Sequence, residues 1–427
     1  MPAVWCSLLA PMASSLWICS ASLWEPQNPS ILDVLLIFLV ASLAHAVGIL
    51  VSSFLLRVSP SVIGMFTLLA STASLTLFIA RKWLDLVYVT SIIGVVTFSS
   101  GIGIAWLRCM ATTELTPSKK TQYDVATVSA EILGVGLFFL LKGLAALRSP
   151  ECAFGVIYVA ASSLNILSLL SLPKFPSTVP DRHICNDPSI PASLFCSHAA
   201  FWSVVMWLPA IISNLYSSNV SSFTCGCILS AGLLAPLIWI LLPRSTLRGR
   251  SQVAALVSSV TLCVLTAIWL TVAPIAPAEC ALPLITTAWL FAVIMGVGPS
   301  LENCSSDDSQ ASIFDQAVAR MGSVVGIAAT PFVWRLGGLG GVLVQLSGIS
   351  LVLLGVVMIP QPATTVDKEV LFAGMSTTPG ALYGNARLVR VFTKGLITGH
   401  HGVMPAKKQG RNSFAFGDIY EESSVLV

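Results

Sequence analysis

Charged side chains are scarce in this sequence. Lysine, arginine, aspartate and glutamate make up 10% of its 427 residues, whereas they make up about 25% of a typical globular chain. A soluble protein of this length could not cover its surface with so few charges, so the composition excludes a set of soluble domains. It also argues against a nucleic-acid-binding protein, which needs a basic surface, and against an extensively disordered chain.

Motifs for metal binding, covalent catalysis and nucleotide binding are also missing. The 11 cysteines include no C-x-x-C, and Cys225 and Cys227 form an isolated pair among thiols scattered through apolar segments. There is no P-loop, no G-x-S-x-G and no H-E-x-x-H, and none of the five histidines belongs to such a motif. The sequence therefore predicts no metal site, no cofactor and no enzymatic activity.

Long apolar runs are what the sequence does contain. Apolar residues make up 55% of the chain, and the mean hydropathy is +0.87. Because a membrane-spanning helix needs about 20 mostly apolar residues, these runs predict an all-α integral membrane protein with about twelve transmembrane helices. The expected spans are 4–24, 31–56, 61–80, 86–107, 125–147, 152–172, 194–216, 222–243, 252–274, 280–299, 317–335 and 339–360.

Two changes in composition divide the chain into four regions. The segment 173–193 contains five prolines, which is typical of a linker. Beyond residue 360 the sequence turns polar and has few apolar runs, which is typical of disorder. We therefore expect an N-terminal six-helix bundle over 1–172, a cytoplasmic linker over 173–193, a C-terminal six-helix bundle over 194–360, and a largely disordered cytoplasmic tail over 361–427.

Basic residues are distributed unevenly between the two sides of this layout. If both termini are cytoplasmic, sixteen lysines and arginines lie in inner segments and four lie in outer loops. Cytoplasmic segments of membrane proteins carry such an excess. The sequence thus predicts a multi-pass protein with both termini in the cytoplasm, in a plasma membrane, an endomembrane or a viral envelope.

The two halves share a pattern of glycines. The fourth expected span ends with Gly101-Ile-Gly103, and the fifth contains Gly134-Val-Gly136. The tenth ends with Gly296-Val-Gly298, and the eleventh contains Gly322 and Gly326. Small residues at such places let membrane helices approach closely. The matching loop lengths favour an internal repeat, and the common occurrence of glycine in membrane helices is the alternative.

With this layout, the sequence resembles the major facilitator superfamily of transporters. The resemblance lies in the six-plus-six arrangement, the central linker and the Glu-Leu-x-Pro join at 114–117. The basic loop 244–250 is similar to the family's cytoplasmic signature, whereas the loop 56–64 lacks the acidic residue and paired arginines that usually stand there. The resemblance implies two helix bundles with a solute site between them near mid-membrane, exposed alternately to each side.

Three ionisable residues in the spans are candidates for solute binding or coupling, because a charge in hydrocarbon costs at least ~2.5–3.5 kcal/mol. Glu131 is either a proton-binding site that titrates with transport or half of a structural ion pair, for instance with Arg108. His45, midway along the second span, is a proton relay, a donor to the solute, or a neutral side chain bonded to a neighbouring helix. Asp33 lines an outer vestibule or is solvated at the interface.

Uncharged polar and aromatic residues give further candidates for the solute site. They are Asn214, Trp202, Thr286 and Trp289. A cavity lined by aromatic and amide groups suits a neutral or weakly polar organic solute, and ordinary helix packing is the alternative. The candidates for a cytoplasmic gate are basic: Arg108, Arg244, Arg248, Arg250 and Arg320. For Arg320, a local pair with Asp315 is the simpler interpretation.

The last ten residues contain a short pattern of their own. Glu421 and Glu422 precede Leu426 and Val427 at the C-terminus. Acidic residues followed by aliphatic ones resemble a sorting signal for an adaptor, and a free apolar C-terminus can enter a PDZ-like groove by strand addition. A solvated tail without a partner is the alternative.

Two functions remain open at this point. The first is a transporter that moves a small organic solute through a lipid bilayer by alternating access. The second is a non-transporting multi-span protein of a membrane or viral envelope, such as a herpesvirus-type envelope protein, with a role in trafficking or membrane organisation. The resemblance makes the transporter the leading hypothesis, and the second function rests on the missing signature in the loop 56–64 and on the few charges in the spans.

Overall fold

Nearly all of the residues whose structure is described are helical. The computed structural model describes residues 7–23, 31–55, 60–80, 83–113, 117–146, 150–170, 189–215, 221–236, 247–272, 281–302 and 309–358. The elements are α2 (Leu9–Ser20), the 3-10 turn η1 (Ala21–Leu23), α3 (Ile31–Leu55), α4 (Pro60–Ala80), α5 (Leu86–Thr113), α6 (Pro117–Ala146), α7 (Pro150–Leu170), α8 (Ser189–Leu215), α9 (Ser221–Ala231), α11 (Leu247–Val272), α12 (Ala281–Glu302) and α13 (Ser309–Met358).

Most of these helices have the length and composition of membrane spans. Eight are long and apolar enough to cross a membrane, and the shorter apolar helices Leu9–Leu23, Ser222–Pro236 and Ala281–Ile294 also fall on expected spans. The protein is therefore an all-helical, multi-span membrane protein in contact with a lipid bilayer. The arrangement of twelve spans in two halves stays a prediction.

Helix α11 shows how apolar side chains are distributed around one span. Val253, Leu256, Val260 and Val264 are all exposed, and they recur every three or four residues. This spacing places them on one face of the helix. An exposed apolar stripe of this kind fits the hydrocarbon of a bilayer, where the backbone groups are already bonded within the helix.

Helix α13 consists of two helices that meet at Gly338. This residue has φ 55° and ψ −137°, a conformation that only glycine adopts readily. A Cβ on Gly341 would collide with the carbonyl oxygen of Val333, so the chain folds back on itself at the kink. Each arm is then long enough for one span. The sequence predicts this break between its eleventh and twelfth spans.

Glycines set the closest contacts between helices. A Cβ on Gly134 of α6 would lie 2.6 Å from the carbonyl oxygen of Met12 in α2. A Cβ on Gly326 of α13 would collide with the carbonyl oxygen of Ala199 in α8. Only a residue without a side chain lets two backbones approach so closely. The same kind of contact therefore joins the fifth expected span to the first and the eleventh to the seventh.

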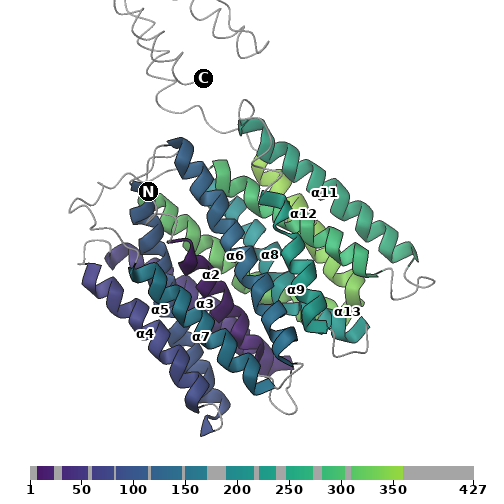
Figure 1. Ribbon diagram of the computed structural model, residues 1–427. Coiled ribbons are helices and arrows are strands. Elements are labelled where there is room, and N and C mark those ends of the chain that lie inside the picture. Colours follow the sequence, from purple (N-terminus) through teal and green to yellow (C-terminus); the bar gives the residue numbers. More distant parts are fainter. Residues whose placement is uncertain are drawn as a thin grey trace, which may run out of the picture. The chain divides into compact units, whose positions relative to one another are not determined.

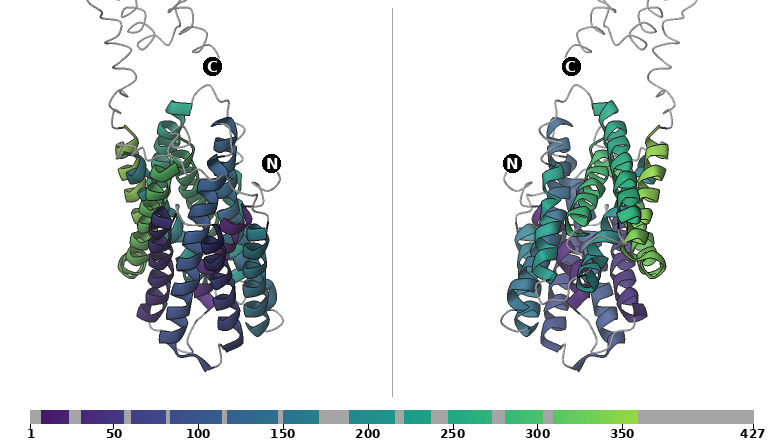
Figure 2. Two further views of the ribbon diagram at one scale, coloured as in Figure 1. Left: turned by 90° about the vertical axis from the view of Figure 1, so that its left-hand side faces the viewer. Right: turned by 90° about the vertical axis from the view of Figure 1, so that its right-hand side faces the viewer.

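The helices that precede residue 171 and those that follow residue 188 lie largely on opposite sides of the bundle. In Figure 1, α4, α5 and α7 lie on one side of α2 and α6, and α9, α11 and α12 lie on the other. The second arm of α13, yellow-green in Figure 2, runs beside α11. There the Ser259 hydroxyl donates to the carbonyl oxygen of Ser350 at 2.8 Å.

Two seams join these two sets of helices. At the α6–α9 seam, Gly136 lies against Ser230. At the α3–α13 seam, Ala317 of α13 shares a buried apolar cluster with Ile49 of α3. Close packing at both seams holds the two sets together at two separate places.

Several helices extend further than the hydropathy predicts. α5 continues to Thr113, α6 begins at Pro117, α8 begins at Ser189, and α13 begins at Ser309. These ends lie inside the expected loops 108–124, 173–193 and 300–316, because hydropathy marks only the apolar part of a helix. Pro117 suits the first turn of α6, because an N–H in the first turn of a helix has no partner within the helix. Most of the expected linker (173–188) and the whole expected tail lie outside the described residues.

Candidate functional site

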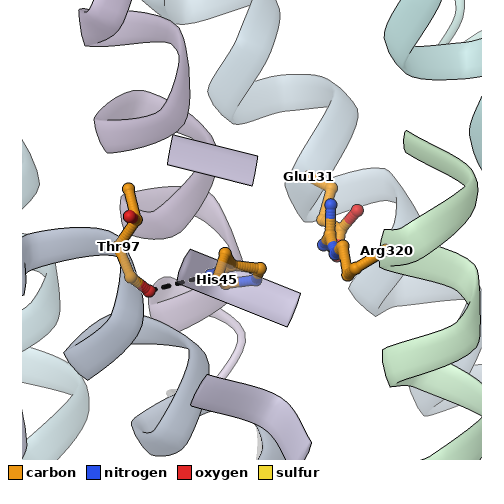
Figure 3. A network of polar contacts seen from close by, with 4 residues as sticks. All are labelled: His45, Thr97, Glu131 and Arg320. Carbon is orange, nitrogen blue, oxygen red and sulfur yellow. Dashed lines mark hydrogen bonds and ion pairs between the residues drawn. The ribbon is translucent and has the colours of Figure 1, made fainter. Parts of the chain in front are cut away.

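A buried ion pair joins α6 to α13. Nη2 of Arg320 donates to Oε1 of Glu131 at 2.6 Å. The two side chains are 7% and 15% exposed, respectively, and Figure 3 shows them reaching toward each other from the two helices. Each charge neutralises the other, and the hydrogen bond between them is of the strong, charge-assisted kind. This is how a carboxylate and a guanidinium persist inside a membrane.

The partners differ from those that the sequence predicts. Sequence reasoning offered Arg108 as a partner for Glu131 and placed Arg320 in a local pair with Asp315, and the second prediction was wrong. Asp315 and Arg320 are five residues apart on α13, whereas side chains that meet on a helix are three or four apart. In addition, α13 begins at Ser309, so Arg320 lies well inside the helix and not at its start.

Arg320 also lies over an aromatic ring. Its Cζ is 5.3 Å from the centre of the Trp202 ring on α8, within the ~6 Å range of a cation–π contact. Trp202 is buried, and the edge of Phe201 packs against it with ring centres 5.4 Å apart. Arg320 therefore contacts α6 through its charge and α8 through an aromatic face.

His45 is buried on α3 and bonded to the neighbouring helix. Its Nδ1 lies 3.1 Å from the carbonyl oxygen of Thr97 in α5, and in the view of Figure 3 its ring lies between Thr97 and the ion pair. Because a carbonyl oxygen only accepts hydrogen bonds, Nδ1 carries the proton and Nε2 of the neutral ring is an acceptor. Of the alternatives predicted for His45, the hydrogen bond to a neighbouring helix is thus present. The role of Nε2 in coupling or solute binding stays a prediction.

Four buried polar atoms in this region have no hydrogen-bond partner among the residues that the structure describes. They are Nη1 of Arg320, Nε1 of Trp202, Nε2 of His45 and Nδ1 of His198. The charge of Arg320 is close enough to act on both histidines. Because buried polar groups in proteins are nearly always bonded, such a concentration marks a place for water or a ligand.

His198 was missed by sequence reasoning. It lies four residues before Trp202 on α8, a spacing that puts both side chains on one face of the helix. That spacing was the available signal, since a histidine and a tryptophan on one face of a membrane helix place two polar nitrogens side by side.

Two other candidates make helix-packing contacts. Nε1 of Trp289 donates to the carbonyl oxygen of Leu229 in α9 at 3.1 Å, and the hydroxyl of Thr286 donates to Leu282 of its own helix at 2.8 Å. Both donors are therefore already used within the bundle. Asp33 lies half-buried in the first turn of α3.

The structure covers the remaining candidates unevenly. Arg108 lies half-buried in α5, and its charge acts on His198. Asn214 lies in α8, and Arg248 and Arg250 lie in α11, but their side chains are outside what the structure describes. The predictions for Arg244 and for Glu421, Glu422, Leu426 and Val427 fall outside the described residues.

The long apolar helices define a class of protein, a multi-span membrane protein. Among solved structures, the chain is similar to a bacterial homologue of the iron transporter ferroportin, in an outward-facing state with soaked iron. The TM-score is 0.60 and the identity 12%, over 83% of this chain and 97% of that one.

A second solved structure leads to the same fold. The chain is similar to the human organic anion transporter MFSD10 (TETRAN), with a TM-score of 0.59 and 13% identity, over 84% of this chain and 98% of that one. The protein therefore has the fold of a major facilitator superfamily transporter. No family model and no curated protein matches the sequence.

Proposed function

We propose that this protein is a transporter that moves a small organic solute across a membrane by alternating access. The two similar structures support this, because both are described as transporters or homologues of transporters, one of them of organic anions. In the proposed layout, twelve spans form two six-helix sets with both termini in the cytoplasm. The solute site lies between the sets.

The recurring glycine contacts support two equivalent halves. Gly134 brings α6 against α2, and Gly322 brings α13 against the carbonyl group of Phe195 in α8. Glu131 precedes the first of these glycines by about one turn, and Arg320 closely precedes the second. The two halves therefore meet through opposite charges at matching places.

The Glu131–Arg320 pair is the observation that carries the proposal. A buried ion pair stabilises a protein less well than apolar packing of the same volume, so one inside a membrane indicates a function. Gly136 of the α6–α9 seam follows Glu131 along α6, and Ala317 of the α3–α13 seam precedes Arg320 along α13. The pair thus joins α6 of one seam to α13 of the other, and opening either seam would change the distance between its charges. Breaking and remaking the pair is then a step of the transport cycle.

A reversible cross-link across the α6–α9 seam tests this proposal. A Cβ on Gly136 would lie 3.4 Å from the Cβ of Ser230, close to the 3.5–4.5 Å of a disulfide. Screening nucleosides, sugars, amino acids, organic acids and drugs for saturable thermal stabilisation identifies a solute. In proteoliposomes, its uptake by Gly136→Cys/Ser230→Cys is expected to stop on oxidation and to return on reduction.

The matched control is Gly136→Ala/Ser230→Ala, which places a Cβ at both positions and cannot form a bond. The exposed thiol of Cys227 is replaced by serine in both proteins. Uptake that continues in fully cross-linked protein would exclude opening of this seam. If no solute stabilises the protein and none is taken up, the non-transporting membrane or envelope protein becomes the better interpretation.

A further inference from the structure

Arg320 has more donors than Glu131 uses. A guanidinium carries five N–H groups in a planar fork, and its contacts with carboxylates are frequently bidentate. Here only Nη2 reaches Glu131, and the buried Nη1 has no partner among the described residues. The ion pair is therefore a one-point contact that leaves a second point of attachment open.

A second unsatisfied donor beside the guanidinium shows what would fit there. The indole N–H of Trp202, on the ring 5.3 Å from the Arg320 guanidinium, can only donate. Two donors from different helices thus require an acceptor, and a carboxylate offers two oxygens with about four lone-pair sites. A cationic group would be repelled by Arg320, and a neutral amide offers a single oxygen.

We propose, building on the transport function above, that Arg320 and Trp202 bind the carboxylate of an organic anion. This carboxylate replaces Glu131 as the partner of Arg320. The carboxylate accepts hydrogen bonds from the guanidinium and from the indole N–H, and the apolar part of the anion lies against the Trp202 ring. This replaces the neutral or weakly polar solute expected from the sequence with an anionic one.

Charge balance assigns a proton to Glu131 in the loaded state. An anion beside the neutral Glu131–Arg320 pair would leave a net negative charge in the membrane, which is strongly unfavourable. Glu131 loses its partner to the anion, so its carboxylate is the group that takes up a proton. The anion and one proton then bind together without net charge. Among the described residues, the other ionisable groups in this region are His45 of α3, His198 of α8, Arg108 of α5 and Asp315 of α13.

Three ligands of the same size and different charge test the site. Benzoate, benzamide and benzylamine share one ring and carry a negative, a neutral and a positive group. Calorimetric titration of the purified protein is expected to show saturable binding of benzoate alone. Glu131→Gln removes the competing carboxylate and keeps its shape, so it is expected to bind benzoate roughly tenfold more tightly.

Variants of the two donors locate the site. Arg320→Gln is expected to abolish benzoate binding, and Trp202→Phe, which keeps a ring but loses the N–H, to weaken it roughly tenfold. Arg335→Gln removes an exposed arginine from the same helix and is expected to bind benzoate as the unaltered protein does. If Arg320→Gln does not fold, Arg320→Lys keeps the charge without the planar fork and is expected to weaken binding.

Two results would overturn the carboxylate site: equal binding of benzoate and benzamide, or full benzoate binding by folded Arg320→Gln. If benzoate does not bind but another solute is taken up by proteoliposomes, the carboxylate site is wrong and the transport function stands. If no solute of any charge binds or is taken up, both proposals fail.

Discussion

Removing one partner of the Glu131–Arg320 pair leaves the other charge alone in the membrane, and the cost follows from the geometry. Two unit charges 2.6 Å apart attract by roughly 6 kcal/mol at an effective dielectric constant of about 20. The desolvation of both groups offsets most of that attraction. We expect Glu131→Gln and Arg320→Gln each to lower the free energy of unfolding by about 3 kcal/mol or more, because a buried charge then has no partner.

The double variant separates pairing from packing. Glu131→Gln/Arg320→Gln has no lone charge and keeps two amides that can bond, so we expect it to be more stable than either single variant. Unfolding in mixed detergent micelles, followed by tryptophan fluorescence, measures all four proteins. Arg335→Gln, at an exposed position, should change the free energy of unfolding by less than about 0.5 kcal/mol. Losses that simply add, within about 0.5 kcal/mol, would refute a direct pair.

Two further predictions concern helix contact and proton binding. Gly326→Ala, whose Cβ would collide with the Ala199 carbonyl oxygen, should destabilise the protein by roughly 1–3 kcal/mol. Gly348→Ala on the same helix, where a Cβ meets nothing within 4 Å, should be neutral or stabilising by about 0.5–1 kcal/mol. Equal unfolding temperatures for the two variants would contradict the close α8–α13 contact. Benzoate binding should take up about one proton per site, measured by calorimetry in buffers of different ionisation enthalpy. Uptake that persists in Glu131→Gln would show that another group receives the proton.

The positions of the spans were predictable because a membrane helix must be both long and apolar. The second expected span, 31–56, coincides with α3 (Ile31–Leu55), and the break expected after residue 335 coincides with the reversal at Gly338. The ends of α6 and α13 were not predictable in the same way. Their first turns are polar, and hydropathy reports the surroundings of a residue, whereas helix formation depends on the backbone.

The ion pair was only half predictable. Glu131 stands out because it lies inside an apolar run, but Arg320 follows a polar stretch that has the composition of a loop. The partner of Glu131 is decided by how α6 packs against α13 across 189 residues of chain, and one sequence does not specify that packing. His198 was within reach of sequence reasoning, since its spacing from Trp202 places both on one face of α8.

Movement of the two helix sets about the Glu131–Arg320 pair can be measured directly. Spin labels at Val87 of α5 and Val272 of α11, both exposed, report the distance between the sets by double electron–electron resonance in nanodiscs. We predict two distance populations, with a ratio that shifts when Glu131→Gln breaks the pair and when benzoate is added to saturation. A single distance distribution, unchanged by Glu131→Gln and by every solute of the screen, would contradict alternating access.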